Sequence, residues 1–217
     1  MKKMSRYSKE LIKSLIPQKL VAYKLKATVA PTLLLTFDDG PHETITPQVL
    51  AQLRRFKIRA LFFVLGEQAE RYPNLLREID REGHFVGNHT FSHPKVSGCS
   101  FTEIRDQIIR CQDSVEEIIG KRPKFFRPPE GHITPTQLAA TFSAGLRTVN
   151  WSNEGGEWGH QENQSATNIA VKLLERSRPS QIILLHDNNP KMPDILERSL
   201  FVLSTSYAVS PEISELI

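Results

Sequence analysis

The chain has 217 residues, a length that suits one globular domain with a sizeable core better than two domains. Its 39% hydrophobic and 24% charged residues are typical of a folded protein and exclude a disordered or low-complexity chain. The formal net charge is +4, but residues 1–30 hold eight Lys or Arg and one acid, which leaves 20 basic and 23 acidic residues in the remainder. This remainder lacks the basic face of a nucleic-acid-binding domain, so we expect no nucleic-acid partner.

Residues 1–30 are interpreted as a basic amphipathic leader and residues 31–217 as the domain that follows it. Apolar residues recur between the lysines at helical spacing, namely Leu11, Ile12, Leu15, Ile16, Leu20, Val21 and Leu25. The spacing suits a helix on an anionic membrane surface, or one packed across an end of the domain. No signal peptide or membrane span is recognised, so we expect a cytoplasmic location, with peripheral membrane contact through residues 1–30 as the alternative.

Short apolar runs alternate with amphipathic stretches in the rest of the chain. About seven strands are predicted, at residues 33–37, 60–65, 84–87, 124–126, 148–151, 181–185 and 207–209. The intervening helices are marked by Pro47, Pro73 and Pro135 near their starts and by a capping box of Ser100 and Glu103. Regular β-α alternation predicts an α/β fold, either an open doubly wound sheet or a barrel, with its site at the strand C-termini.

Polar residues follow five of the predicted strands, so their side chains are expected on one rim. They are Asp38, Asp39, His89, His93, Arg127, Glu154, Glu157 and His186. Singly, each has an ordinary explanation: Asp38–Pro41 as a surface turn, Arg127 in an ion pair, His186 as a buried strand cap. Together, one carboxylate and two histidines suit a divalent ion with open positions, and a second carboxylate and a third histidine remain as an acid/base pair.

Five ordered motifs in this chain resemble those of a known family. They are TFDDGP (36–41), HTFSHP (89–94), RPPEG (127–131), WSNEGGEW (151–158) and ILLHD (183–187). The set is similar to that of polysaccharide deacetylases, also called carbohydrate esterase family 4 or the NodB homology domain. The resemblance implies a distorted, incompletely closed (β/α) barrel and makes residues 31–217 the catalytic domain.

The resemblance also implies roles for individual residues. Asp39, His89 and His93 would hold a divalent metal, most often Zn²⁺ in this family. Asp38 would act as the general base and His186 as the general acid. Their positioning residues would be Arg127 for Asp38 and Glu157 for His186, and the substrate would contact Glu130, Trp151, Trp158 and Leu184.

Three residues depart from the family pattern. Glu130 replaces an aromatic residue, and Glu154 and Glu157 replace aspartates. The side chain of Glu157 is one methylene longer than that of Asp, and the adjacent Gly155 and Gly156 would provide the slack that it needs.

The function implied by the resemblance is metal-dependent hydrolysis of the carbon-nitrogen bond of N-acetyl groups on an amino-sugar-containing glycan. An N-acetylated glycan or oligosaccharide is the expected substrate. Two alternatives stay open at this point: a metal-dependent hydrolase of a small non-glycan amide, and a catalytically lapsed carbohydrate-binding relative. The sequence leaves the oligomeric state and the identity of the glycan undetermined.

Overall fold

The computed structural model describes residues 17, 19–27, 29–95, 98–158 and 163–209. Within them, nine strands form one sheet in the order β1-β6-β5-β4-β3-β2-β8-β7, and β9 also pairs with β2. All eight pairings between named strands are parallel. The strands are β1 (Val21–Ala22), β2 (Thr32–Asp38), β3 (Leu61–Val64), β4 (Phe85–Asn88), β5 (Phe125–Phe126), β6 (Arg147–Val149), β7 (Asn153–Glu154), β8 (Gln181–His186) and β9 (Ala208–Val209).

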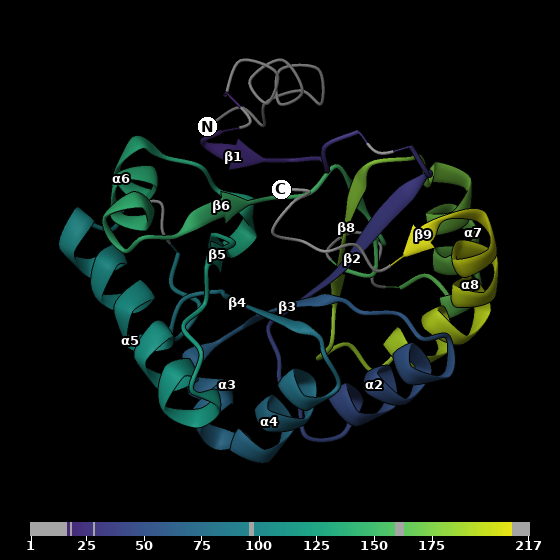
Figure 1. Cartoon of the computed structure of the whole chain (residues 1–217), viewed down its shortest axis with the longest axis horizontal. Coiled ribbons are helices and arrows are strands. Elements are labelled where there is room, and N and C mark those ends of the chain that lie inside the picture. Colours follow the sequence, from purple (N-terminus) through teal and green to yellow (C-terminus); the bar gives the residue numbers. More distant parts are fainter. Residues whose placement is uncertain (1–16, 18, 28, 96–97, 159–162, 210–217) are drawn as a thin grey trace.

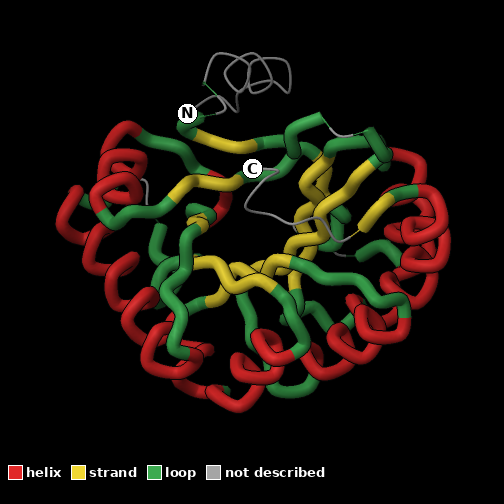
Figure 2. Tube along the Cα trace, viewed as in Figure 1, coloured by secondary structure: helices red, strands yellow, loops and turns green. Residues whose placement is uncertain are grey.

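Helices cover the outside of the curved sheet (Figure 1). They are α2 (Ile45–Arg55), α3 (Gly66–Arg71), α4 (Pro73–Arg81), α5 (Phe101–Ile119), α6 (Pro135–Ser143), α7 (Ala166–Arg176) and α8 (Met192–Ser206), with a short 3-10 turn at Pro129–Gly131. Figure 2 shows the strands curving around the centre of the molecule, with the helical layer outside them. The expected incompletely closed (β/α) barrel is confirmed.

The two faces of the strands pack into different clusters. On β2, Leu33, Leu35 and Phe37 belong to the large core between sheet and helices. Leu34 points the other way, into a smaller cluster with Phe63 and others inside the curve of the sheet. Because side chains alternate along a strand, Thr36 and Asp38 continue the inner face toward the C-terminal end of β2.

The predicted strands all occur, and two additional strands do not follow from the sequence. Strand β1 lies inside the pattern interpreted as helical, and β7 consists of two polar residues, Asn153 and Glu154, which show no apolar run. The buried residues of β1, Val21 and Ala22, pair with Thr148 and Val149 although they lie within the predicted leader. The helical spacing inferred for residues 20–25 is therefore wrong, because sheet pairing is what buries these side chains.

The amphipathic pattern at residues 11–16 lies outside the described residues. Among the described helices, none is both long enough and apolar enough to cross a bilayer. Membrane contact through residues 1–30, the cytoplasmic location and the division of the chain at residue 30 stay predictions.

Helix ends follow the sequence signals at most positions. Pro73 and Pro135 open α4 and α6, and Gly120 ends α5 with a left-handed φ of 68°. Helix α2 begins at Ile45, ahead of the Thr46-Pro47 pair expected to start it. The imidazole Nδ1 of His42 accepts from the backbone N–H of Ile45 at 3.4 Å and so caps this earlier start.

The capping box of α5 predicts a stability change that can be measured. Ser100 Oγ accepts from the backbone N–H of Glu103 at 3.2 Å, and Glu103 Oε2 accepts from the N–H of Ser100 at 2.7 Å. We expect Ser100→Ala to lower the free energy of unfolding by about 1 kcal/mol in urea denaturation, because one N-terminal N–H loses its acceptor. Thr102→Ala, an exposed change in the same first turn, is the control and should not destabilise; an equal loss in both variants would contradict the assignment.

Candidate metal and acid-base site

The predicted site residues meet at the C-terminal ends of the strands. Asp38 ends β2 and His186 ends β8, and the two are register partners on neighbouring strands. Asp39 and His93 adopt left-handed backbone conformations, with φ of 73° and 56°. Such φ values are uncommon in residues other than glycine and cluster at functional sites, where the surrounding structure holds them.

Asp39, His89 and His93 offer three ligand atoms within 4.8 Å of one another. Asp39 Oδ1 lies 3.5 Å from His89 Nε2 and 3.6 Å from His93 Nε2. This oxygen is buried, and within the described part of the chain it has no hydrogen-bond partner. A buried acceptor without a donor is rare unless an ion or water satisfies it, so the three residues fit a divalent cation.

The protonation of His89 suits this role. Its Nδ1 lies 2.7 Å from the backbone oxygen of Arg127, which can only accept, so Nδ1 carries the hydrogen and Nε2 presents its lone pair to Asp39 and His93. Burial lowers the pKa of His89 to about 3, so the ring stays neutral near neutral pH.

Asp38 is held by a guanidinium from another strand. Arg127 is completely buried, and its Nη1 donates to Asp38 Oδ1 and to Thr36 Oγ1, each at 2.7 Å. Its remaining nitrogens donate to the backbone oxygens of Val149 and Asn150, each at 3.2 Å. Burial raises the pKa of Asp38, and the charge of Arg127 opposes that rise.

His186 is paired with the glutamate that departs from the family pattern. Its Nδ1 lies 3.0 Å from Glu157 Oε1. Burial lowers the pKa of His186, but the hydrogen bond and charge of Glu157, with Asp38 and Asp39, outweigh burial, so the pKa is raised.

The glycine pair before Glu157 makes room for the longer side chain. A Cβ at Gly155 would lie 2.5 Å from Glu157 Oε2 and 2.7 Å from Leu185 Cδ2. Gly156 adopts a φ of 75°, which glycine tolerates without strain. The slack expected from these two glycines is therefore present.

Two of the predicted substrate-contacting residues, Trp158 and Leu184, lie near His186. Trp158 is half exposed, with its ring centroid 5.2 Å from that of His186. Leu184 lies two residues before His186 on β8, and Trp151 packs against Gly131. Glu130 is exposed and its carboxylate pairs with His132 Nδ1 at 3.3 Å.

A buried carboxyl that the sequence analysis did not single out lies beneath the site. Asp187 Oδ2 accepts from Thr46 Oγ1 at 2.5 Å, and Thr46 Oγ1 accepts from the backbone N–H of His42 at 2.7 Å. A Cβ at Gly40 would lie 2.2 Å from both carboxylate oxygens of Asp187. Burial raises the pKa of Asp187 to about 7. The position of Asp187 inside the fifth motif was its only sequence signal, and Thr46 had none.

The family model described as polysaccharide deacetylase matches residues 25–149. The chain belongs to the polysaccharide deacetylase family. A peptidoglycan-N-acetylglucosamine deacetylase of Bacillus cereus is 40% identical over 74% of this chain and 56% of its own length, so the match spans little more than half of that relative. A chitooligosaccharide deacetylase of Azorhizobium caulinodans is 38% identical over 73% of this chain and 75% of its own.

A solved structure of the same family supports the fold. The peptidoglycan deacetylase PdaC of Bacillus subtilis superposes with a TM-score of 0.79 at 30% identity, over 86% of this chain and 90% of that chain.

Removing the guanidinium should test how much of the site depends on it. We expect Arg127→Leu to lower the free energy of unfolding by about 3–5 kcal/mol, because Asp38 would remain buried without its partner. Arg122, which pairs with Asp113 and Glu116 at the surface, provides the control. Arg122→Leu should cost less than about 1 kcal/mol in the same denaturant titration, and similar losses for both variants would contradict this account.

Proposed function

We propose that this chain is a metal-dependent deacetylase that hydrolyses N-acetyl groups on an amino-sugar-containing glycan. One observation carries the proposal: the Asp39, His89 and His93 cluster lies beside two hydrogen-bonded pairs, Asp38 with Arg127 and His186 with Glu157. The first pair suits a general base and the second a general acid. The names of the relatives support the N-acetylated glycan as substrate class.

Asp39, His89 and His93 would hold the ion. Two imidazole nitrogens and one carboxylate oxygen form a common ligand set for catalytic Zn²⁺, so zinc is the proposed metal. When bound, such an ion supplies positive charge that acidifies a water molecule and polarises a carbonyl oxygen. His89 is kept in the ligand-competent tautomer by its bond to the Arg127 carbonyl oxygen.

Asp38 would remove the proton from the attacking water. Its Oδ1 is occupied by Arg127, and its Oδ2 lies 3.7 Å from His89 Nε2, so Oδ2 is directed toward the ligand cluster. The raised pKa of Asp38 makes its carboxylate a stronger base than an exposed aspartate. Arg127 fixes the side chain and acts as a positioning residue.

His186 would protonate the nitrogen of the acetamide as its bond to the acetyl carbon breaks. Glu157 accepts from Nδ1, which leaves Nε2 free to face the substrate. The raised pKa of His186 favours the protonated ring that a general acid requires. Trp151, Trp158 and Leu184 are proposed to contact the acetyl group and sugar, and Glu130 the substrate at the edge of the site.

The metal assignment can be tested with Asp39→Asn, since Asn also tolerates the left-handed φ of residue 39. Mutating a residue that only hydrogen-bonds to a metal ligand typically lowers metal affinity about 10- to 100-fold. Because Asp39 is itself a proposed ligand, we expect bound zinc, measured by atomic emission, to fall by more than this. Acetate release from N-acetylglucosamine oligomers should fall with it, and a chelator should abolish wild-type release.

Asp106→Asn, an exposed change on α5, is the control and should retain both zinc and activity. Full zinc binding and acetate release by Asp39→Asn would overturn the metal site. A zinc-loaded wild type that releases no acetate from any glycan would favour the small-amide hydrolase or the lapsed binding protein.

The acid assignment predicts a shifted pH profile. Glu157→Gln removes the charge that raises the pKa of His186, so that pKa should fall. Because the general acid must be protonated, the high-pH limb of kcat/KM should move to lower pH, whereas the low-pH limb should stay. Glu154→Gln, an exposed change at the end of β7, is the matched control. A high-pH limb at the same pH in Glu157→Gln and in the wild type would refute the pairing.

A further inference from the structure

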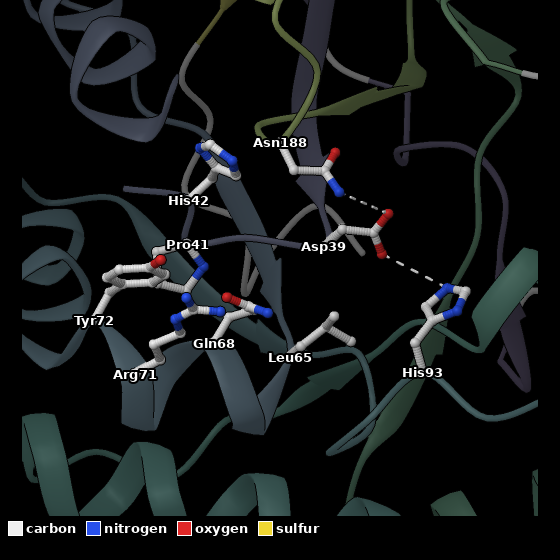
Figure 3. A pocket seen from close by; sticks show the side chains of 9 residues that line it. All are labelled: Asp39, Pro41, His42, Leu65, Gln68, Arg71, Tyr72, His93 and Asn188. Atoms are coloured by element: carbon white, nitrogen blue, oxygen red, sulfur yellow. Dashed lines mark hydrogen bonds and ion pairs between the residues drawn. The ribbon is translucent and has the colours of Figure 1, made fainter. Parts of the chain in front are cut away.

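A pocket lined in part by the proposed metal ligands Asp39 and His93 extends to residues that this mechanism does not use. It has a volume of 410 Å³ and extends from Asp39 and His93 across α3 to Arg71 and Tyr72 (Figure 3). Pockets of about 300–1,000 Å³ are typical of small-molecule sites. The space is therefore sufficient for a group larger than a single ion.

Unused hydrogen-bond donors line the far wall of this pocket. Within the described part of the chain, the guanidinium of Arg71 makes no hydrogen bond or ion pair, and its one recorded contact is with the Tyr72 ring, 5.3 Å away. The side-chain amide of Gln68 and the hydroxyl of Tyr72 also lack recorded hydrogen-bond partners among these residues. His42 Nδ1 accepts from the backbone, so its neutral ring carries the hydrogen on Nε2.

The charge of the pocket favours an anion. Among the lining residues, Asp39 is the one acid, and the bound cation would offset its charge. Glu70, next to Arg71 in the sequence, accepts from Ser114 Oγ at 2.6 Å on the α5 side instead. The planar fork of an arginine matches a carboxylate with two parallel hydrogen bonds.

The wall that carries Arg71 is fixed to the catalytic loops. Backbone N–H groups at the start of α3 donate across the rim: Leu65 to the oxygen of Gly40, Gly66 to that of Thr90, and Glu67 to that of Phe91, at 3.0, 3.1 and 3.0 Å. These bonds join α3 to the segments that carry Asp39 and His93. A ligand held by Arg71 would therefore be positioned relative to the metal ligands.

We propose that this pocket binds a carboxylate carried by the glycan itself, on a sugar next to the one that loses its acetyl group, and that Arg71 recognises its charge. This inference rests on the proposed deacetylase function and narrows its substrate class to acidic N-acetylated glycans. Gln68, Tyr72 and His42 contribute neutral donors, and Arg71 sets the preference for charge.

The test uses two matched glycans and the zinc-loaded full chain. One glycan is a peptide-free strand in which every second amino sugar carries a lactyl carboxylate, and the other is the same strand with those carboxylates converted to methyl amides. Dissociation constants are measured by thermophoresis at low temperature, where turnover is slow. Acetate release is measured in a separate assay.

We expect the wild type to bind the acidic strand about 10- to 100-fold more tightly than the amidated strand. This is the gain in affinity that a hydrogen bond to a charged group provides. Arg71→Gln should abolish this preference without weakening binding of the amidated strand. Arg71→Lys should retain part of it, because the charge remains but the fork is lost. Arg81→Gln, which removes an equal charge from the end of the neighbouring helix α4, should keep the preference.

Equal binding of the two strands by the wild type would overturn the proposal, as would an equal loss in Arg71→Gln and Arg81→Gln. A preference that appears only when peptides are attached to the strand would also overturn it. The acetate measurement tests the deacetylase function separately. If that function is wrong, neither strand releases acetate, whereas the ratio of the two dissociation constants is unchanged.

Discussion

The buried guanidinium of Arg127 is the interaction on which the site depends. Its side chain bonds to Asp38 and Thr36 on β2 and to backbone oxygens at the end of β6, while its own carbonyl oxygen accepts from His89. One residue therefore connects the proposed base with a proposed metal ligand. A guanidinium loses several kcal/mol of hydration on complete burial, and only a full set of acceptors offsets that loss. The four acceptors around Arg127 provide it.

The loops above Arg127 hold conformations that the chain would not adopt alone. Asp39 and His93 have positive φ, which costs about 1–3 kcal/mol at such residues. Packing and hydrogen bonds offset this cost: Gly40 lies against the carboxyl of Asp187, and its oxygen accepts from the N–H of Leu65. The turn that presents Asp39 is therefore fixed by the buried carboxyl that follows β8 and by the β3–α3 connection.

A hydrogen-bonded carboxylate distinguishes two buried histidines that belong to one site. Burial lowers the pKa of His89 to about 3, although the charge of Asp39 opposes that fall. Burial also lowers the pKa of His186, but the hydrogen bond and charge of Glu157, together with Asp38 and Asp39, outweigh burial and raise that pKa. A neutral imidazole suits a metal ligand and a protonated one suits a proton donor, so the environment alone assigns different chemistry to the same residue type.

The sequence by itself determined the family, the alternation of strands and helices, and the residues that gather at the strand ends, because motifs and hydrophobic periodicity are local properties. It predicted that two glycines would accommodate Glu157, since the need for space follows from side-chain length. It did not reveal β1 or β7, which are stabilised by pairing with distant strands. The complete burial of Arg127, the support of Gly40 by Asp187 and the position of Arg71 in its pocket were decided only by the tertiary structure. Each depends on groups that lie far apart in the chain and meet when the sheet curves.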